Sequence, residues 1–176
     1  MKEKIRQIAL SAGAEVCGFA NIDRFIDLPV EYAPSGVYKD CHSVVALGKA
    51  LPKGLSQVKP QLIYNYFNGY LVTMVDDILF RVAKQTEQMF GGFAVPIPCD
   101  MSGSWNDETK TAHGILSVKH LAVQAGIGFM GKNTILCNER FGNLMTVGVI
   151  LLSLDLPSDD LCKNYCPPKC HICIDN

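Results

Sequence analysis

The chain has 176 residues, with 16 Lys and Arg against 17 Asp and Glu and an apolar share of 48%. This length predicts one domain with at most a short appendix, and the apolar share is sufficient for a hydrophobic core. The nearly balanced charge lacks the basic excess typical of nucleic-acid-binding proteins, so it does not indicate tRNA binding. No apolar run reaches the ~18 residues of a transmembrane helix, and residues 1–6 do not resemble a signal peptide. We therefore expect a soluble cytoplasmic protein with no membrane partner.

The first quarter of the chain predicts a helix and two strands. Residues 3–13 place apolar side chains at helical spacing and end at Gly13. Residues 14–20 are typical of a strand, whereas residues 21–41 contain helix and strand breakers and predict irregular structure. Residues 42–48 form a second strand, apolar enough to lie centrally in a sheet.

The longest periodic segment is 61–89, where apolar residues recur at i, i+3 and i+4. This pattern predicts a long helix with a broad apolar face, which Gly69 weakens slightly. Tyr64, Tyr66 and Tyr70 lie in it. They fit either ordinary core and flank positions, which we favour, or the lining of a ligand pocket.

The next segments are shorter. Residues 93–98 are strand-like, but their prolines restrict them to a sheet edge or a strand end. Residues 99–111 predict a polar loop containing Trp105, which is either a lid over a binding site or a solvated loop. Residues 115–125 predict a helix.

The last predicted elements are a strand at 134–137 and a strongly apolar strand at 144–154, which most simply form a hairpin. Residues 157–160 predict a linker. Together the elements predict an α/β fold with a mixed or mostly antiparallel sheet and flanking helices. We expect a cofactor-binding domain at 1–156 and a separate cysteine-rich segment at 157–176.

The segment around which the chain is organised is 124–135, Gln-Ala-Gly-Ile-Gly-Phe-Met-Gly-Lys-Asn-Thr-Ile. Glycine lets the backbone approach a ligand, lysine adds a positive charge, and asparagine adds donors and acceptors. This combination favours a bulky anionic or amide-bearing cofactor. The glycine spacing matches a dinucleotide fingerprint, but that motif needs a strand before it and a helix after it. The predicted order is inverted, so we exclude a Rossmann site.

A polar stripe leads into this loop. His113, Ser117, His120 and Gln124 follow one another at spacings of four, three and four residues, which puts them on one face of a helix. A lone histidine is usually structural. Two on one face beside a glycine loop favour a ligand or proton-transfer role, so His113 and His120 are candidate proton donors.

The eight cysteines fall into two groups. Four are dispersed beside strand-like residues and predict buried, inert thiols: Cys17, Cys41, Cys99 and Cys137. The other four crowd the last 15 residues and predict metal ligands rather than disulfides: Cys162, Cys166, Cys170 and Cys173.

Thiolates are soft ligands that suit iron–sulfur clusters or zinc. The run Cys170-x2-Cys173 matches the second half of a bacterial ferredoxin motif, which continues to a Cys-Pro that is absent here. We therefore expect the sequence to stop just before a ligand, with Cys162 as the alternative fourth ligand. A zinc site of paired knuckles would need a second Cys-x2-Cys pair, and a disordered thiol-rich tail is the other alternative.

With the glycine loop and the cysteine tail together, the chain resembles the epoxyqueuosine reductase-like iron–sulfur proteins. Residues 117–134 are similar to that family's helix and its Ala-Gly-Leu-Gly-x-x-Gly-Lys-Asn-Thr signature, which is the specific part of the likeness. Residues 4–19 and 43–48 are more weakly similar to its first helix and first two strands. The resemblance implies a cobalamin-binding α/β domain, also similar to that of reductive dehalogenases, and 4Fe–4S clusters.

The resemblance also implies roles for individual residues. Those at the corrinoid would be Gly126, Gly128, Gly131, Lys132, Asn133 and Thr134. Cys166, Cys170 and Cys173 would be ligands of the first cluster. The family's acidic proton donor has no counterpart in residues 111–118, where His113 is the candidate replacement, and the second set of ferredoxin cysteines is absent.

The leading hypothesis is an oxidoreductase in which a cluster passes single electrons to a cobalamin that reduces a small or nucleoside-like substrate. Ferredoxin or flavodoxin would be the electron donor. The first alternative is a non-catalytic corrinoid- or metal-binding domain, and the second is a zinc-stabilised module.

Overall fold

The fold is built around a four-stranded sheet of order β1-β2-β8-β3, in which all neighbours are antiparallel. In the computed structural model the strands are β1 (Val16–Asn21), β2 (Ser43–Ala50), β8 (Met145–Leu152) and β3 (Ala94–Ile97). The structure describes residues 1–100 and 102–175, without the side chains of residues 31, 102–104 and 111–113. The predicted α/β fold with an antiparallel sheet and flanking helices is confirmed, and the proline-containing strand lies at an edge as expected.

The predicted hairpin between residues 134–137 and 144–154 is wrong. β8 lies between β2 and β3, while β7 (Leu136–Cys137) pairs with β6 (Phe129–Met130) in a separate small sheet. The reason is burial. Residues 147–152 of β8 are all buried, and such a run is stable only in a sheet centre covered on both faces.

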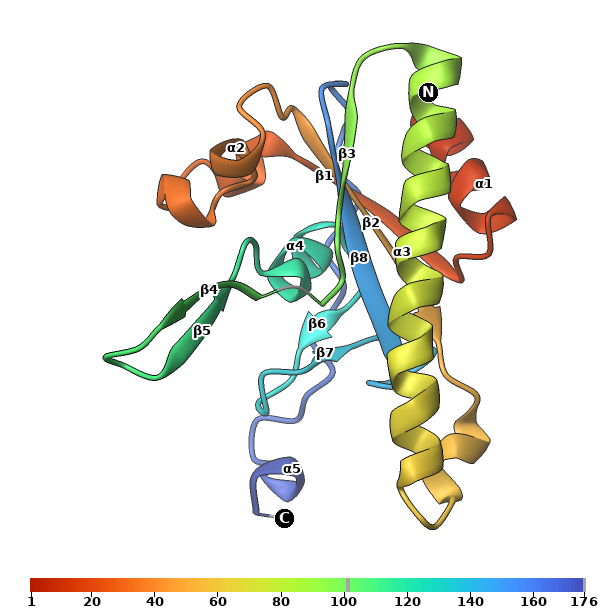
Figure 1. Ribbon diagram of the computed structural model, residues 1–176, viewed down its shortest axis with the longest axis vertical. Helices are drawn as coiled ribbons and strands as arrows, with labels where there is room; N and C mark the ends of the chain where they lie inside the picture. Colours follow the sequence, from red (N-terminus) through yellow and green to blue (C-terminus); the bar gives the residue numbers. More distant parts are fainter. Residues whose placement is uncertain (101, 176) are drawn as a thin grey trace.

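The two faces of the sheet carry two separate cores. Alternating strand residues such as Val45, Leu47 and Ile150 pack against α1 (Lys2–Ser11) and α3 (Leu62–Phe90). Their neighbours, such as Val44, Ala46 and Val149, pack against α4 (Val118–Gln124) on the opposite face. Figure 1 shows α3 and α1 on one side of the sheet and α4 on the other. The period-2 alternation of side chains thus fixes a three-layer arrangement.

The predicted long helix is confirmed, but its apolar face is buried only in part. The buried residues of α3 run from Leu71 to Thr86, where Leu79 approaches Gly148 of β8 so closely that a Cβ there would lie 2.5 Å from Leu79 Cδ1. The first turns of α3 extend past the sheet (Figure 1), and Tyr66 and Tyr70 in them are 70% and 53% exposed.

Gly69 gives a direct test of this helix. A Cβ at Gly69 would meet no atom within 4 Å, so we expect Gly69→Ala to stabilise the protein by about 0.5–1 kcal/mol through lower backbone entropy in the unfolded chain. Urea unfolding measures the change. Gly148→Ala is the control for a crowded position. It should destabilise the protein, because the added Cβ would clash with Leu79. A Gly69→Ala protein that is less stable than the wild type would contradict the helix as described.

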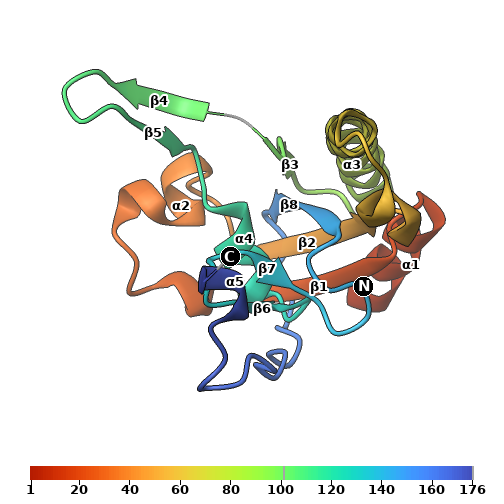
Figure 2. The same ribbon diagram turned by 90° about the horizontal axis from the view of Figure 1, so that it is seen from below.

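The remaining elements are short. They are η1 (Ile22–Phe25), η2 (Val30–Tyr32), α2 (Pro34–Val37), η3 (Lys53–Gln57), β4 (Ser102–Asn106), β5 (Thr111–Gly114) and α5 (Ile172–Asp175). The predicted loop 99–111 is in fact largely the β4–β5 hairpin, which reaches away from the body (Figure 2). Trp105 is 59% exposed on it and donates its indole N–H to Asp107 at 2.9 Å. No helix in the described ranges is long and apolar enough to cross a membrane.

The segment predicted as a linker is bound to the first strand and helix. The Asp159 carboxylate lies 2.6 Å from Lys2 Nζ and 2.9 Å from Arg6 Nη2, and it accepts the backbone N–H of Phe19 at 3.1 Å. The Asp159 N–H donates in turn to the Phe19 carbonyl at 2.8 Å. Residues 155–160 are therefore held against the sheet before the cysteine tail begins.

This cluster predicts a pH-dependent stability. Burial would raise the pKa of Asp159, but the hydrogen bonds and charges of Lys2 and Arg6 hold this pKa below its ordinary value. A carboxylate with a lowered folded-state pKa stabilises the protein at neutral pH, and that stabilisation is lost as the pH falls through the lowered pKa. We expect Asp159→Asn to cost about 1–2 kcal/mol at neutral pH, since the side chains are partly exposed, and the deficit should shrink in acid.

Urea unfolding of the wild type and of Asp159→Asn, from neutral pH down to acidic pH, measures this difference in stability. Asp77→Asn, which removes an exposed pair with Arg81 on α3, is the matched control and should change stability by less than ~0.5 kcal/mol. A constant deficit at every pH would show that Asp159 acts without its charge.

Candidate functional site: the glycine loop and the cysteine tail

The glycine loop starts where α4 ends. Gly126 takes φ +78°, a left-handed conformation that L side chains rarely adopt, and its N–H closes the helix onto the Val123 carbonyl at 2.9 Å. The chain then forms the β6–β7 hairpin, whose turn includes Thr134 at φ +61°. The sequence order of helix, loop and strand is thus confirmed, which agrees with the exclusion of a dinucleotide fold.

Close contacts with backbone atoms require glycine at two positions of the loop, Gly126 and Gly128, whereas Gly131 is crowded mainly by a side chain. A Cβ on Gly126 would lie 2.2 Å from the Asp160 carbonyl oxygen, and one on Gly128 would lie 2.5 Å from the Cys137 carbonyl oxygen. A Cβ on Gly131 would lie 2.8 Å from Asn133 Oδ1. The missing side chains therefore let the loop pack against β7 and against the segment that leads to the cysteines.

Lys132 joins the loop to the cysteine tail. Its ammonium donates to the carbonyl oxygens of Pro168 and Cys170, the latter at 2.8 Å. Beside it, the rings of Phe129 and Tyr165 meet edge to face with centroids 5.9 Å apart. Figure 1 shows α5 directly below the β6–β7 hairpin. The structure thus brings together the two motifs that the sequence singled out.

Asn133 and Thr134 shape the turn. The Asn133 side-chain oxygen accepts the N–H of Ile135 at 3.2 Å, and the Thr134 carbonyl accepts a hydrogen bond from Lys119 Nζ at 2.8 Å. Thr134 is exposed and Asn133 is partly exposed, so their side chains remain accessible to a bound molecule. That any residue of 126–134 contacts a corrinoid stays a prediction.

Cys137 is a further candidate for this site that sequence reasoning missed. Burial raises the pKa of its thiol, and the nearby thiols of Cys166 and Cys173 raise this pKa further. The strand β7 therefore brings Cys137 within electrostatic reach of two tail cysteines. The signal available in the sequence was its place directly after the glycine loop and before the polar run 138–140.

Cys162 lies near the carboxylate of Glu139. Burial and the carboxylate of Glu139 raise the pKa of Cys162, and its thiol contacts the Lys163 carbonyl oxygen at 3.5 Å. Cys166 and Cys170 are partly exposed and Cys173 is exposed.

Across the described residues, side chains of His, Cys, Asp and Glu do not form a group of three arranged to hold a metal ion. The donor set is nevertheless all thiol, which suits an iron–sulfur cluster or zinc and does not suit a hard cation such as Mg²⁺. The residues therefore fit a thiolate-bound group in chemistry, although their thiols do not converge on one point.

The other dispersed cysteines behave as small hydrophobic residues. Burial raises the pKa of Cys17 to about 12 and that of Cys41 to about 11, and it also raises the pKa of Cys99. Such thiols are weak nucleophiles and weak metal ligands at neutral pH. The prediction of inert thiols is consistent with the environment of these three.

The two candidate histidines are separated. His113 lies in β5, so the predicted helical stripe is wrong for this residue, and its side chain is outside the described set. His120 is exposed on α4, and its Nδ1 lies 2.6 Å from Ser117 Oγ. It lines a cavity of about 410 Å³ together with Arg24, Tyr32 and Gln124. His120 thus has a hydroxyl partner and a cavity beside it, which suits a proton donor or acceptor.

The fold and this site define an α/β domain with an antiparallel sheet, a glycine loop and a cysteine-rich tail fixed to it. No family model matches the chain. Epoxyqueuosine reductase of Lactococcus garvieae is 20% identical over 200 residues, which span 96% of this chain and 56% of that protein. The enzyme of Staphylococcus aureus is 36% identical over 62 residues, or 35% of this chain. In sequence, the chain looks like a short relative of epoxyqueuosine reductase.

Solved structures agree on the fold. Epoxyqueuosine reductase from Streptococcus thermophilus has a TM-score of 0.69 and 20% identity, covering 99% of this chain and 51% of that one. An epoxyqueuosine reductase with a modified tRNA stem loop has a TM-score of 0.69 and 17% identity, covering 99% of this chain and 50% of that one. A catabolic reductive dehalogenase has a TM-score of 0.65 and 16% identity, covering 92% of this chain and 22% of that one. The chain thus spans about half the length of the epoxyqueuosine reductases it matches overall.

Proposed function

We propose that the chain is the cofactor-binding portion of a redox protein related to epoxyqueuosine reductase, with a thiolate-bound iron–sulfur cluster in its tail. The observation that carries this proposal is the contact of Lys132 with the backbone of the tail at Pro168 and Cys170. Through this contact Lys132 of the glycine loop lies next to the cysteine run, which supports a site in which a group bound by the cysteines would lie beside the loop. The relatives by sequence, which are epoxyqueuosine reductases, support a redox role.

Each residue of this site has its own proposed role. Cys166, Cys170 and Cys173 hold the group, which supplies single electrons when it is bound. Lys132 orients the tail through two backbone carbonyls, and the Phe129–Tyr165 ring contact holds the tail against β6. His120, with its Nδ1 bonded to Ser117, exchanges a proton with a substrate in the adjoining cavity.

Anaerobic reconstitution with iron and sulfide tests the metal assignment. We expect iron and acid-labile sulfide in equal amounts, with zinc absent after exchange. The alternative of a zinc-stabilised module predicts a zinc-to-protein ratio near one and no sulfide, and that result would replace the redox proposal. A cluster that forms but cannot be reduced would favour the alternative of a non-catalytic binding domain.

The finer part of the proposal is a corrinoid at residues 126–134 and a nucleoside substrate. A structural neighbour is described as a dehalogenase with a B12-dependent mechanism, which supports the corrinoid. Because the backbone of the loop is packed against the tail, contact would be made by the accessible side chains of Asn133 and Thr134. Retention of hydroxocobalamin on gel filtration tests this, and its loss in Thr134→Ala but not in Thr109→Ala is the expected pattern.

The neighbour that holds a tRNA stem loop supports a nucleoside-like substrate and gives no support to the doubt about tRNA that the balanced charge of the chain raises. We therefore extend the proposal to a nucleoside within tRNA. Binding of an epoxyqueuosine-modified stem loop at low salt, weakened at high salt, is the expected result. Equal binding of an unmodified stem loop would contradict recognition of the nucleoside.

A further inference from the structure

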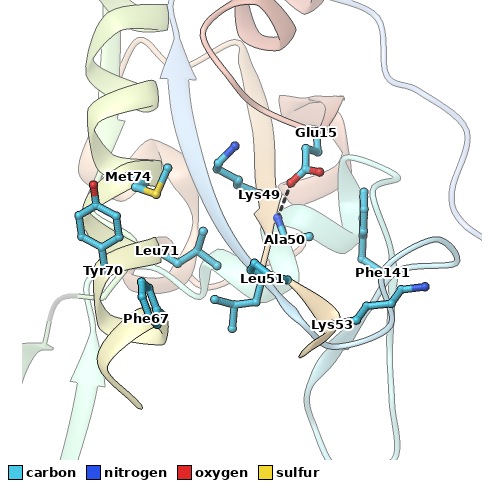
Figure 3. A pocket seen from close by; sticks show the side chains of 11 residues that line it. Glu15, Lys49, Ala50, Leu51, Lys53, Phe67, Tyr70, Leu71, Met74 and Phe141 are labelled. Atoms are coloured by element: carbon cyan, nitrogen blue, oxygen red, sulfur yellow. Dashed lines mark hydrogen bonds between the residues drawn. The ribbon is translucent and has the colours of Figure 1, made fainter. Parts of the chain in front are cut away.

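A second cavity lies at the end of β2, between the first turns of α3 and the turn that follows β7. Its volume is about 470 Å³, within the range of about 300–1,000 Å³ typical of small-molecule sites. Figure 3 shows Phe67 and Tyr70 on the α3 side, and Phe141 and Lys53 on the other side. The glycine loop and the cysteine tail contribute no side chain to this lining.

The lining is mainly apolar and aromatic. Phe67 and Tyr70 stay 43% and 53% exposed at i and i+3 of α3, next to Leu71 and Met74 of the same helix face. Phe141 is partly exposed across the cavity. Aromatic rings that remain exposed around a concavity offer flat surfaces on which another ring can stack.

The polar groups of the cavity are mostly cationic. Glu15 and Lys49 are engaged, because Glu15 accepts the N–H of Ala50 at 2.8 Å (Figure 3) and Lys49 donates to the Gly13 carbonyl at 3.0 Å. Within the described part of the chain, Lys53 Nζ has no ion-pair or hydrogen-bond partner, and it is exposed at the rim. The Arg140 guanidinium adds a further positive charge 4.7 Å from the centre of the Phe141 ring.

We infer that this cavity binds a small planar aromatic molecule that carries an anionic group. The ring lies against the aromatic side chains of α3 and Phe141, where it replaces water on apolar surface. The anionic group lies at the rim near Lys53. Among the described residues that line the cavity, Lys53 is the charged residue whose side chain has no hydrogen-bond or ion-pair partner. A carboxylate or a phosphate satisfies this chemistry, so an aromatic acid and a nucleotide are its two sources.

Calorimetric titration of the whole chain with 4-hydroxybenzoate and with guanosine 5′-monophosphate tests the inference and separates the two sources. We expect one of them to bind with a Kd below ~1 mM. The uncharged 4-hydroxybenzamide and guanosine should bind at least about tenfold more weakly, since they lack the anionic group. Inorganic phosphate and acetate should show no binding, because they lack the ring.

Two matched pairs of variants locate the site. Tyr70→Ala and Lys53→Gln should each weaken binding about tenfold. Tyr66→Ala, one turn away on the same helix and outside the cavity, and Lys84→Gln, also exposed on α3, should change the Kd less than about twofold. All four positions are exposed, so the variants should fold, and their unfolding curves verify this.

Three results would overturn the inference. One is no heat of binding with either aromatic anion. Another is phosphate binding as tightly as guanosine 5′-monophosphate, which would make the site an anion site without a ring pocket. The last is an equal loss of affinity in Tyr66→Ala and Tyr70→Ala. The titration uses protein without added iron, so its outcome is independent of whether a cluster forms.

Discussion

Gly126→Ala destabilises the protein by about 3 kcal/mol or more, the largest effect that we expect from adding a single methyl group. Two causes add. The residue has φ +78°, which is unfavourable for alanine, and the new Cβ would lie 2.2 Å from the Asp160 carbonyl oxygen. Because Asp160 follows the Asp159 cluster, the displaced backbone is the segment that leads into the cysteine tail.

Gly142→Ala separates the two causes. Gly142 also has a positive φ, +60°, but a Cβ there would meet no atom within 4 Å. We expect a cost of about 1–2 kcal/mol from the backbone conformation alone. Equal losses in urea unfolding for the two variants would mean that Gly126 is needed only for its φ, and that the tail is not packed on the loop.

Cys166→Ser, Cys170→Ser and Cys173→Ser should each remove most of the iron bound after anaerobic reconstitution. Serine keeps the size of the side chain but loses the soft thiolate that binds iron. Cys17→Ala is the control, because burial raises the pKa of Cys17 to about 12 and makes this thiol a weak metal ligand. It should keep the iron content of the wild type.

The same series compares the two candidates for a fourth thiol. Cys137 lies within electrostatic reach of Cys166 and Cys173, whereas Cys162 lies beside Glu139. We therefore expect Cys137→Ser to lower the iron content more than Cys162→Ser. The reverse order would restore Cys162 as the fourth ligand that the sequence predicts. Iron unchanged in all five tail and β7 variants would contradict a cysteine-bound cluster.

Local periodicity was sufficient to predict most of the elements. The spacing of Ile5, Ile8 and Ala9 predicts α1, and the long apolar run of 61–89 predicts α3, because both patterns record which face is buried. Local periodicity does not predict the position of β8 between β2 and β3 in the sheet. Sequence proximity favours a hairpin with the preceding strand, whereas burial of β8 on both faces requires the sheet centre, which is a property of the assembled fold.

The site was predicted in its parts but not in its assembly. The glycine loop and the cysteine run are local patterns and can be read directly. The contact between Lys132 and Cys170 joins residues 38 positions apart, and the contact between Arg6 and Asp159 joins residues 153 apart. Periodicity carries no information on such pairs. For the same reason Cys137 was grouped with the inert thiols, although the fold brings it near two tail cysteines.

The most direct test of the central claim, a redox cluster held by the tail against the glycine loop, is the visible absorption of the reconstituted chain before and after anaerobic reduction with dithionite. We expect a broad absorption band that bleaches on reduction, returns on reoxidation, and is missing in Cys170→Ser. A colourless protein that holds zinc, with the same spectrum in the wild type and in Cys170→Ser, would contradict it.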